Sequence, residues 1–150
     1  MNRVSWVIAT ACGLGYAPIA SGTVASAAAA ALWYLLPPLS PAAQWIACAA
    51  AALIGIWAAG AVAKQAGDHD PSIVVIDEVV GMWLALAAAP RTLPAILVAF
   101  GLFRFFDIGK WPPMKQLERL PGGFGIMMDD VAAGLISRAL LALGLAWMGR

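Results

Sequence analysis

Charged residues are scarce in this chain. They make up 11% of its 150 residues, against about 25% in a typical soluble domain. Only Arg3 is charged before Lys64. The net charge is +1 and no basic stripe is interleaved with aromatic residues. These features argue against a protein that binds nucleic acid by electrostatic attraction.

The chain also has few residues suited to soft-metal or thiol chemistry. It contains one histidine, His69, and two cysteines, Cys12 and Cys48. That set cannot supply a zinc site built from His and Cys ligands. A cysteine-nucleophile phosphatase would need a downstream Arg at P-loop spacing, which neither Cys has. A histidine nucleophile with a histidine acid would need two histidines. Both cysteines stand in apolar runs, where free Cys is usually a small buried hydrophobe.

Apolar residues are abundant instead. Hydrophobic residues make up 63% of the chain, the mean hydropathy is +0.85, and Trp, which favours membrane interfaces, occurs seven times. We therefore expect a single-domain, all-α, polytopic membrane bundle of about four to five apolar helices. The expected segments are 23–36, 41–67, 73–89, 93–108 and about 129–148. Several apolar stretches (23–36, 79–89 and 93–103) are shorter than the ~20 residues of a full span.

All eight acidic residues lie between Asp68 and Asp130. They fall mainly into three clusters, 68–78, around Asp107, and 129–130. Carboxylates beside a membrane are costly unless they are paired, metal-bound or hydrated. Three clusters in one small apolar protein indicate a site of oxygen ligands, the chemistry that Mg²⁺ and Ca²⁺ prefer.

The topology predicts that the three clusters meet. Two apolar segments, 79–89 and 93–103, separate the first cluster from the other two, and an even number of crossings returns the chain to the same side. Most basic residues fall on that side, whereas the opposite loops carry little besides Arg91. By the positive-inside rule, the carboxylate-rich face is cytoplasmic.

Each candidate residue has a structural interpretation beside the functional one. Asp77 and Glu78 could be ordinary first-turn acids that offset a helix macrodipole, and Asp129 or Asp130 could be an N-cap. A flexible loop is expected at 122–125.

Three further candidates are equally open. Arg104, Asp107 and Lys110 are spaced by three, which suits phosphate binding or a simple salt-bridge ladder. His69 is expected to be a loop residue. Arg138 could snorkel to the interface or face the bundle interior.

The sequence resembles the phosphatidylglycerophosphatase A family over nearly its whole length. The residues that carry the resemblance are Gly22-Thr23 with Ser26, Ser72-Ile73-Val74 through Asp77-Glu78-Val79-Val80-Gly81-Met82, Phe103-Arg104-Phe105-Phe106-Asp107-Ile108 with Lys110, and Gly122 through Asp130 with Ala133-Gly134. One local departure is Trp111-Pro112-Pro113 after Lys110, where the family usually reads Pro-Trp-Pro. The resemblance implies a Mg²⁺-dependent phosphatase of bacterial inner membranes. Its substrate would be phosphatidylglycerophosphate, which loses its terminal phosphate to give phosphatidylglycerol.

Combined with that resemblance, the residues predict metal-assisted hydrolysis of a phosphomonoester. Asp77, Glu78, Asp129 and Asp130 would hold Mg²⁺, and Asp107 would complete the catalytic carboxylates. Arg104 and Lys110 would offset charge on the phosphoryl group. Thr23 and Ser26 would contact the head group or else serve helix start and packing. A carboxylate could act as general base or attack directly.

Two other functions are also compatible with these residues. The first is a CDP-lipid-dependent phosphotransferase, although its repeated Asp pattern with a Gly-Ala-Arg insert is missing. The second is a transporter or structural subunit, although inverted repeats are not visible. The sequence predicts membrane lipids as surroundings and no nucleic-acid partner, and it does not predict the oligomeric state.

Overall fold

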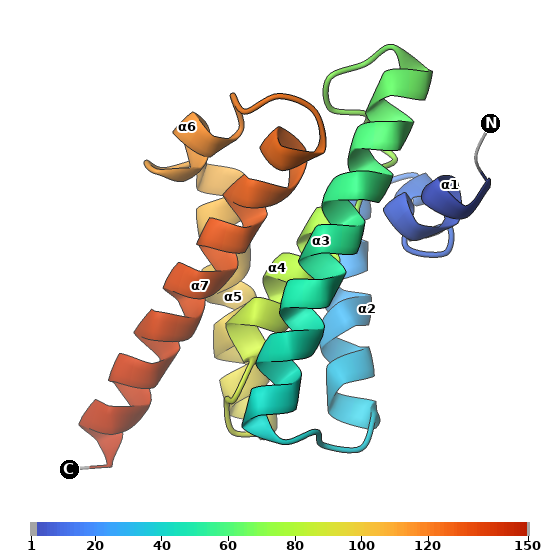
Figure 1. Cartoon of the computed structure of the whole chain (residues 1–150). Coiled ribbons are helices and arrows are strands. Elements are labelled where there is room, and N and C mark those ends of the chain that lie inside the picture. Colours follow the sequence, from blue (N-terminus) through green and yellow to red (C-terminus); the bar gives the residue numbers. More distant parts are fainter. Residues whose placement is uncertain (1–2, 150) are drawn as a thin grey trace.

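A computed structural model describes residues 3–149, and within that range the regular structure is entirely helical. The elements are α1 (Arg3–Ala9), a 3₁₀ turn η1 (Leu14–Tyr16), α2 (Ser21–Leu35), α3 (Pro41–Ala66), α4 (Ile76–Leu86), α5 (Leu93–Gly109), α6 (Met114–Leu117) and α7 (Gly123–Met148). The predicted all-α class is confirmed. Figure 1 shows the long helices running between two ends of the molecule, with α6 and the start of α7 at the upper end.

Two helices in the described range are long and apolar enough to cross a membrane. These are α3 and α7, each of 26 residues. The other three large helices, α2, α4 and α5, have 15, 11 and 17 residues. The prediction of four to five membrane helices therefore stays a prediction.

The bounds of α3 follow directly from its end residues. The Ser40 side chain accepts a hydrogen bond from the Ala43 N–H at 3.3 Å, and Pro41 occupies the first turn, where its missing N–H costs nothing. Gly67 ends the helix with a φ of 67°, a left-handed conformation that glycine adopts without strain. The predicted helix from Pro41 to about Gly67 is confirmed.

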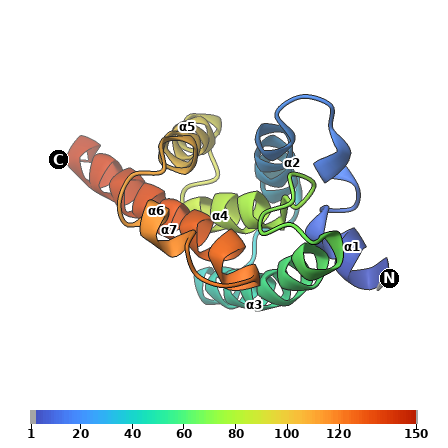
Figure 2. The same ribbon diagram turned by 90° about the horizontal axis from the view of Figure 1, so that it is seen from above.

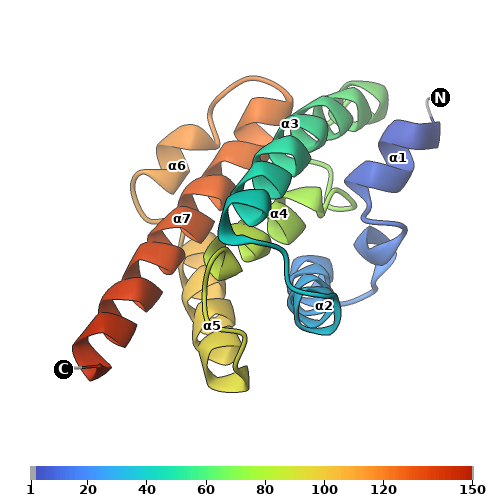
Figure 3. The same cartoon turned by 60° about the horizontal axis from the view of Figure 1, so that its bottom comes forward.

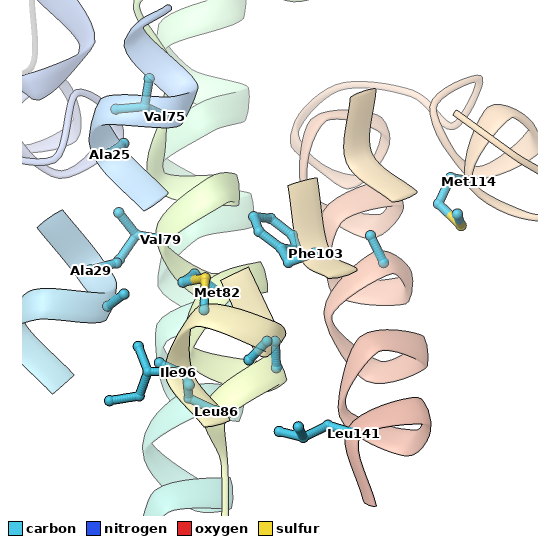
Figure 4. Packing of buried hydrophobic residues seen from close by; sticks show 14 residues of the cluster. Ala25, Ala29, Val75, Val79, Met82, Leu86, Ile96, Phe103, Met114 and Leu141 are labelled. Carbon is cyan, nitrogen blue, oxygen red and sulfur yellow. The ribbon is translucent and has the colours of Figure 1, made fainter. Parts of the chain in front are cut away.

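The short helix α4 lies at the centre of the molecule and packs against α2, α3, α5 and α7. Figures 2 and 3 show α2 and α5 on one side of α4, with α3 on the other. Figure 4 shows the core between them, where Val79, Met82 and Leu86 of α4 meet Ala29 of α2 and Phe103 of α5. The packing of α4 against these four helices positions its N-terminal turn, which carries Asp77 and Glu78.

Polar side chains satisfy the far end of α4. At 11 residues it is about 16 Å long, roughly half of a ~30 Å hydrocarbon layer. Gln44 of α3 accepts the Ala88 N–H at 2.6 Å. Arg138 of α7 donates through Nη2 to the Ala88 carbonyl at 2.9 Å and through Nε to the Ala87 carbonyl. Arg138 therefore faces the bundle interior, and α4 is shorter than the predicted 73–89.

The start of α7 differs from the prediction. The helix begins at Gly123, with Gly122 as its N-cap at φ 61°, so 122–125 is not a flexible loop. Gly123 packs so closely on the Ile56 carbonyl of α3 that a Cβ there would overlap it. Asp129 and Asp130 consequently lie in the second turn of α7, and their interpretation as N-caps is wrong.

Candidate active site

A pocket of about 220 Å³ opens where the N-terminal turns of α4 and α7 meet the C-terminal end of α5. The predicted site residues that line it are Asp77, Glu78, Asp107, Lys110, Asp129 and Asp130. The three acidic clusters therefore meet at one end of the bundle, as the topology predicted. The central position of α4 and the early start of α7 bring them together.

Three carboxylates form the tightest group in the pocket. Asp77, Glu78 and Asp130 each offer an oxygen, and these oxygens all lie within 4.8 Å of one another. Among residues 3–149, Oδ1 of Asp77 and Oε2 of Glu78 are buried without a hydrogen-bond partner. Like charges this close repel, and buried carboxylates need pairing or a cation. The donor set therefore fits a hard divalent cation, which takes carboxylate oxygens as ligands.

Asp129 lines the same pocket and is paired with a cation of the protein. The ammonium of Lys110 donates to Oδ2 of Asp129 at 2.6 Å and to Oε1 of Glu118 at 3.3 Å. Partial burial lowers the pKa of Lys110, but its hydrogen bond to Asp129 and the nearby carboxylate charges outweigh burial and raise that pKa above its ordinary value. Lys110 therefore carries a fixed positive charge at the pocket wall.

Arg104 lies one layer behind the pocket. Its guanidinium forms an ion pair with Asp107, which lies three residues later on the same face of α5, and donates through Nη1 to Oγ of Ser26 at 3.4 Å. Within the described chain, Nε of Arg104 is buried without a partner. The predicted salt-bridge ladder is thus half formed, because Arg104 pairs with Asp107 whereas Lys110 pairs with Asp129.

The predicted head-group residues on α2 are placed differently from the carboxylates. Ser26 is fully buried and donates to the Gly22 carbonyl at 2.7 Å while accepting from Arg104. Neither Ser26 nor Thr23 is among the described residues that line the pocket. Gly22 instead packs directly against Glu78, since a Cβ on it would overlap the Glu78 carboxylate.

Several pocket residues were not proposed as site residues from the sequence. Ser21, Ser72 and Glu118 line the pocket, and the Ser21 hydroxyl donates to the Ser72 carbonyl at 3.3 Å. The usable signal was position, since Ser21 adjoins the Gly22-Thr23 motif and Ser72 begins the motif that contains Asp77 and Glu78. His69 also lines the pocket but is exposed, consistent with its interpretation as a loop residue.

The fold and the pocket define a class of protein: a helical bundle with two long apolar helices and a carboxylate-rich pocket at one end. The family model for phosphatidylglycerophosphatase A matches residues 7–145. The chain belongs to the phosphatidylglycerophosphatase A family and is a phosphatase.

Individual relatives agree with this assignment to differing degrees. Phosphatidylglycerophosphatase A of Escherichia coli is 36% identical over 94% of this chain and 83% of its own length. The Haemophilus influenzae protein of the same name is 41% identical over 64% of this chain and 60% of its own length. A Bacteroides thetaiotaomicron protein, provisionally named a phosphatidylinositol-3-phosphatase, is 41% identical over 95% of this chain and 96% of its own length. No solved structure matches the chain.

Proposed function

We propose that this protein is a Mg²⁺-dependent lipid phosphatase that hydrolyses the terminal phosphomonoester of phosphatidylglycerophosphate to phosphatidylglycerol and phosphate. Family membership supports the reaction class, and two relatives carry the name of this activity. The observation that carries the proposal is the group formed by Asp77, Glu78 and Asp130, whose oxygens converge within 4.8 Å.

The carboxylates are the proposed Mg²⁺ ligands. Asp77, Glu78 and Asp130 would hold the ion, with Asp129 contributing its Oδ1, which is buried and unpartnered in the described chain. A bound Mg²⁺ supplies a charge that polarises the phosphate and acidifies a water. Asp107, which lines the same pocket, is the candidate to accept a proton from that water as general base.

The two cations have separate proposed tasks. Lys110 reaches into the pocket and would offset negative charge on the transferring phosphoryl group. Arg104 holds Asp107 in place through their ion pair. Its unpartnered Nε leaves it a donor for a second phosphate oxygen. Ser26 would orient Arg104 rather than touch the head group.

The apolar surface and the two long helices support a membrane location. Large apolar side chains are exposed along the bundle, including Leu53 at 69% and Leu143 at 68%. Such surface is compatible with lipid rather than water. Lys64, Lys115 and Arg119 stand at the pocket end, which by the positive-inside rule faces the cytoplasm. The proposed site is therefore at the cytoplasmic surface of the bacterial inner membrane.

The main question of substrate concerns the head group. The Bacteroides relative points to phosphatidylinositol 3-phosphate as a second candidate. Both lipids carry a phosphomonoester, so the same carboxylates would serve either. The pocket of about 220 Å³ is below the ~300–1,000 Å³ of sites for drug-sized ligands, which favours the small glycerol head group.

The test is release of inorganic phosphate from the two lipids by the purified protein, with Mg²⁺ and with a chelator. We expect Mg²⁺-dependent release, faster from phosphatidylglycerophosphate. Asp130→Asn, shown to be folded by thermal unfolding, should be inactive. Absence of release by folded wild-type protein, across several detergents and lipids, would overturn the proposal and return the CDP-lipid transferase and transport functions to consideration.

A further inference from the structure

A second hollow lies below the active-site pocket, between α2 and α5. It has a volume of about 330 Å³ and is lined by Ala27, Ala30, Ala31 and Tyr34 of α2 and by Leu93, Ile96, Leu97 and Phe100 of α5. Every lining side chain except the Tyr34 hydroxyl is apolar. Figures 2 and 3 show α2 and α5 on the same side of α4, so the two helices form the walls of this groove.

The groove exists because α2 presents small residues to α5. Three of its four lining positions on α2 are alanine, and those side chains are too short to reach the opposite helix. The core behind the groove is closed, since Ala29, Ile96 and Met82 pack there (Figure 4). On the outer side, Leu97 is 60% exposed and Leu93 is 59% exposed, so the groove opens away from the bundle.

The upper end of the groove is polar and adjoins the active site. Ser26 immediately precedes the lining residue Ala27, and Arg104 lies one helical turn beyond Phe100. Their hydrogen bond, at 3.4 Å, joins α2 to α5 at this point. Arg104 in turn pairs with Asp107, which lines the catalytic pocket. The carboxylate pocket, the partly buried Arg104 and the apolar groove therefore follow one another along α5.

We infer that the groove between α2 and α5 holds an acyl chain of the lipid substrate while its head group occupies the carboxylate pocket. The inference rests on the proposed function and adds the part of the substrate that the pocket cannot accommodate. A phospholipid monoester has this sequence of chemistries: a terminal phosphate, a linking phosphate and apolar chains. From Ala27 to Tyr34 the groove is about 10 Å long, so it takes part of one chain and leaves the remainder in the bilayer.

A third hollow, which is also apolar, provides the matched control. It has a volume of about 370 Å³ and lies at the opposite end of the bundle, with Trp33, Ala47 and Trp83 in its wall. No described residue of the active-site pocket lines it. Ala31→Phe fills the proposed groove from an exposed position of α2, and Ala47→Phe makes the same change in the distant hollow.

The experiment compares two substrates with each variant. One is phosphatidylglycerophosphate with long acyl chains, and the other is its deacylated head group. For Ala31→Phe, kcat/KM on the lipid should fall at least about tenfold more than on the deacylated compound, about 1.4 kcal/mol of selective loss. Ala47→Phe should show no such difference. Equal losses on both substrates, or none on either, would overturn the inference.

Photolabelling gives a second measurement that does not depend on turnover. A phosphatidylglycerophosphate analogue with a diazirine within its acyl chain should label peptides containing Leu97 or Ala31, and Ala31→Phe should reduce that label. Label confined to the Trp33 and Trp83 hollow, or a cross-link from the groove to a second copy of the chain, would refute the acyl-chain assignment. Absence of phosphate release by the wild type would instead refute the proposed function. The labelling result would then still test, by itself, whether the groove binds an acyl chain.

Discussion

A single methyl group at Gly22 should lower the activity of the enzyme about 10²-fold without unfolding it. An added Cβ would lie 2.9 Å from the carboxyl carbon of Glu78, whereas carbon atoms in contact are ~3.5–4.0 Å apart. The Glu78 carboxylate would therefore have to move by about 1 Å, a misplacement that can cost about 10²-fold in rate. Because the displaced group is the end of a flexible side chain, the off-rotamer cost is only about 0.5–1.5 kcal/mol.

Substitutions at two other glycines serve as controls. They separate the displacement of Glu78 from the general effects of Gly→Ala changes on helix propensity and on packing. A Cβ on Gly144 would meet nothing within 4 Å, so Gly144→Ala should keep full activity and gain up to about 1 kcal/mol. A Cβ on Gly134 would lie 3.0 Å from the Gly81 carbonyl carbon, a backbone atom that cannot swing aside. Gly134→Ala should therefore lose about 1–3 kcal/mol of stability through overpacking.

The assay is phosphate release per folded molecule, read beside the thermal unfolding of each variant in detergent. The expected pattern is activity lost and fold kept for Gly22→Ala, both kept for Gly144→Ala, and stability lost for Gly134→Ala. Full activity of Gly22→Ala would show that Glu78 does not need its present position. A stability loss as large as that of Gly134→Ala would show that the α2–α4 contact, and not the carboxylate, had been disturbed.

Three further predictions test the charges of the site and the hydrogen bonds at the far end of α4. Mg²⁺ should raise the unfolding temperature of the wild type, because binding to the folded state stabilises it, and should not raise that of Asp130→Asn; an equal rise in both would contradict the ligand assignment. Lys110→Met should lower the stability equally at about pH 6 and about pH 9. Because the pKa of Lys110 is raised in the folded state, its ion pairs stabilise the fold fully at any pH below the ordinary lysine pKa of ~10.4, and this stabilisation is lost only as the pH rises further. A loss of stability that is already smaller at about pH 9 than at about pH 6 would refute this. Arg138→Leu should lower stability by about 1–3 kcal/mol, since the carbonyls at the end of α4 lose their donors, and an unchanged unfolding temperature would mean that other donors replace it.

Much of the fold could be predicted because its signals are local. Ser40 and Pro41 start α3 and Gly67 ends it through their own backbone preferences, and the apolar runs predict helices wherever they occur. The gathering of the acidic clusters at one end also followed from counting apolar segments. The reaction class came from motifs that family membership then confirmed.

The errors arose where packing overrides local preference. Asp129 and Asp130 are good N-cap residues, yet α7 begins six residues before Asp129, at Gly123. Glycines there let α7 approach the α3 backbone, and that close contact extends the helix. The short α4 is a similar case, because Gln44 and Arg138 from distant helices satisfy its end.

The sequence by itself determined the helical class, the apolar character, the set of carboxylates and the family, since each depends on residue type and short-range spacing. Only the tertiary structure decided which carboxylates converge and which cation pairs with which acid. Asp77, Glu78 and Asp130 form one group, Lys110 forms an ion pair with Asp129, and Arg104 forms one with Asp107. Those pairings depend on how α4, α5 and α7 are rotated about their axes and shifted along them relative to one another. Contacts among glycines, alanines and buried side chains far apart in sequence set that geometry.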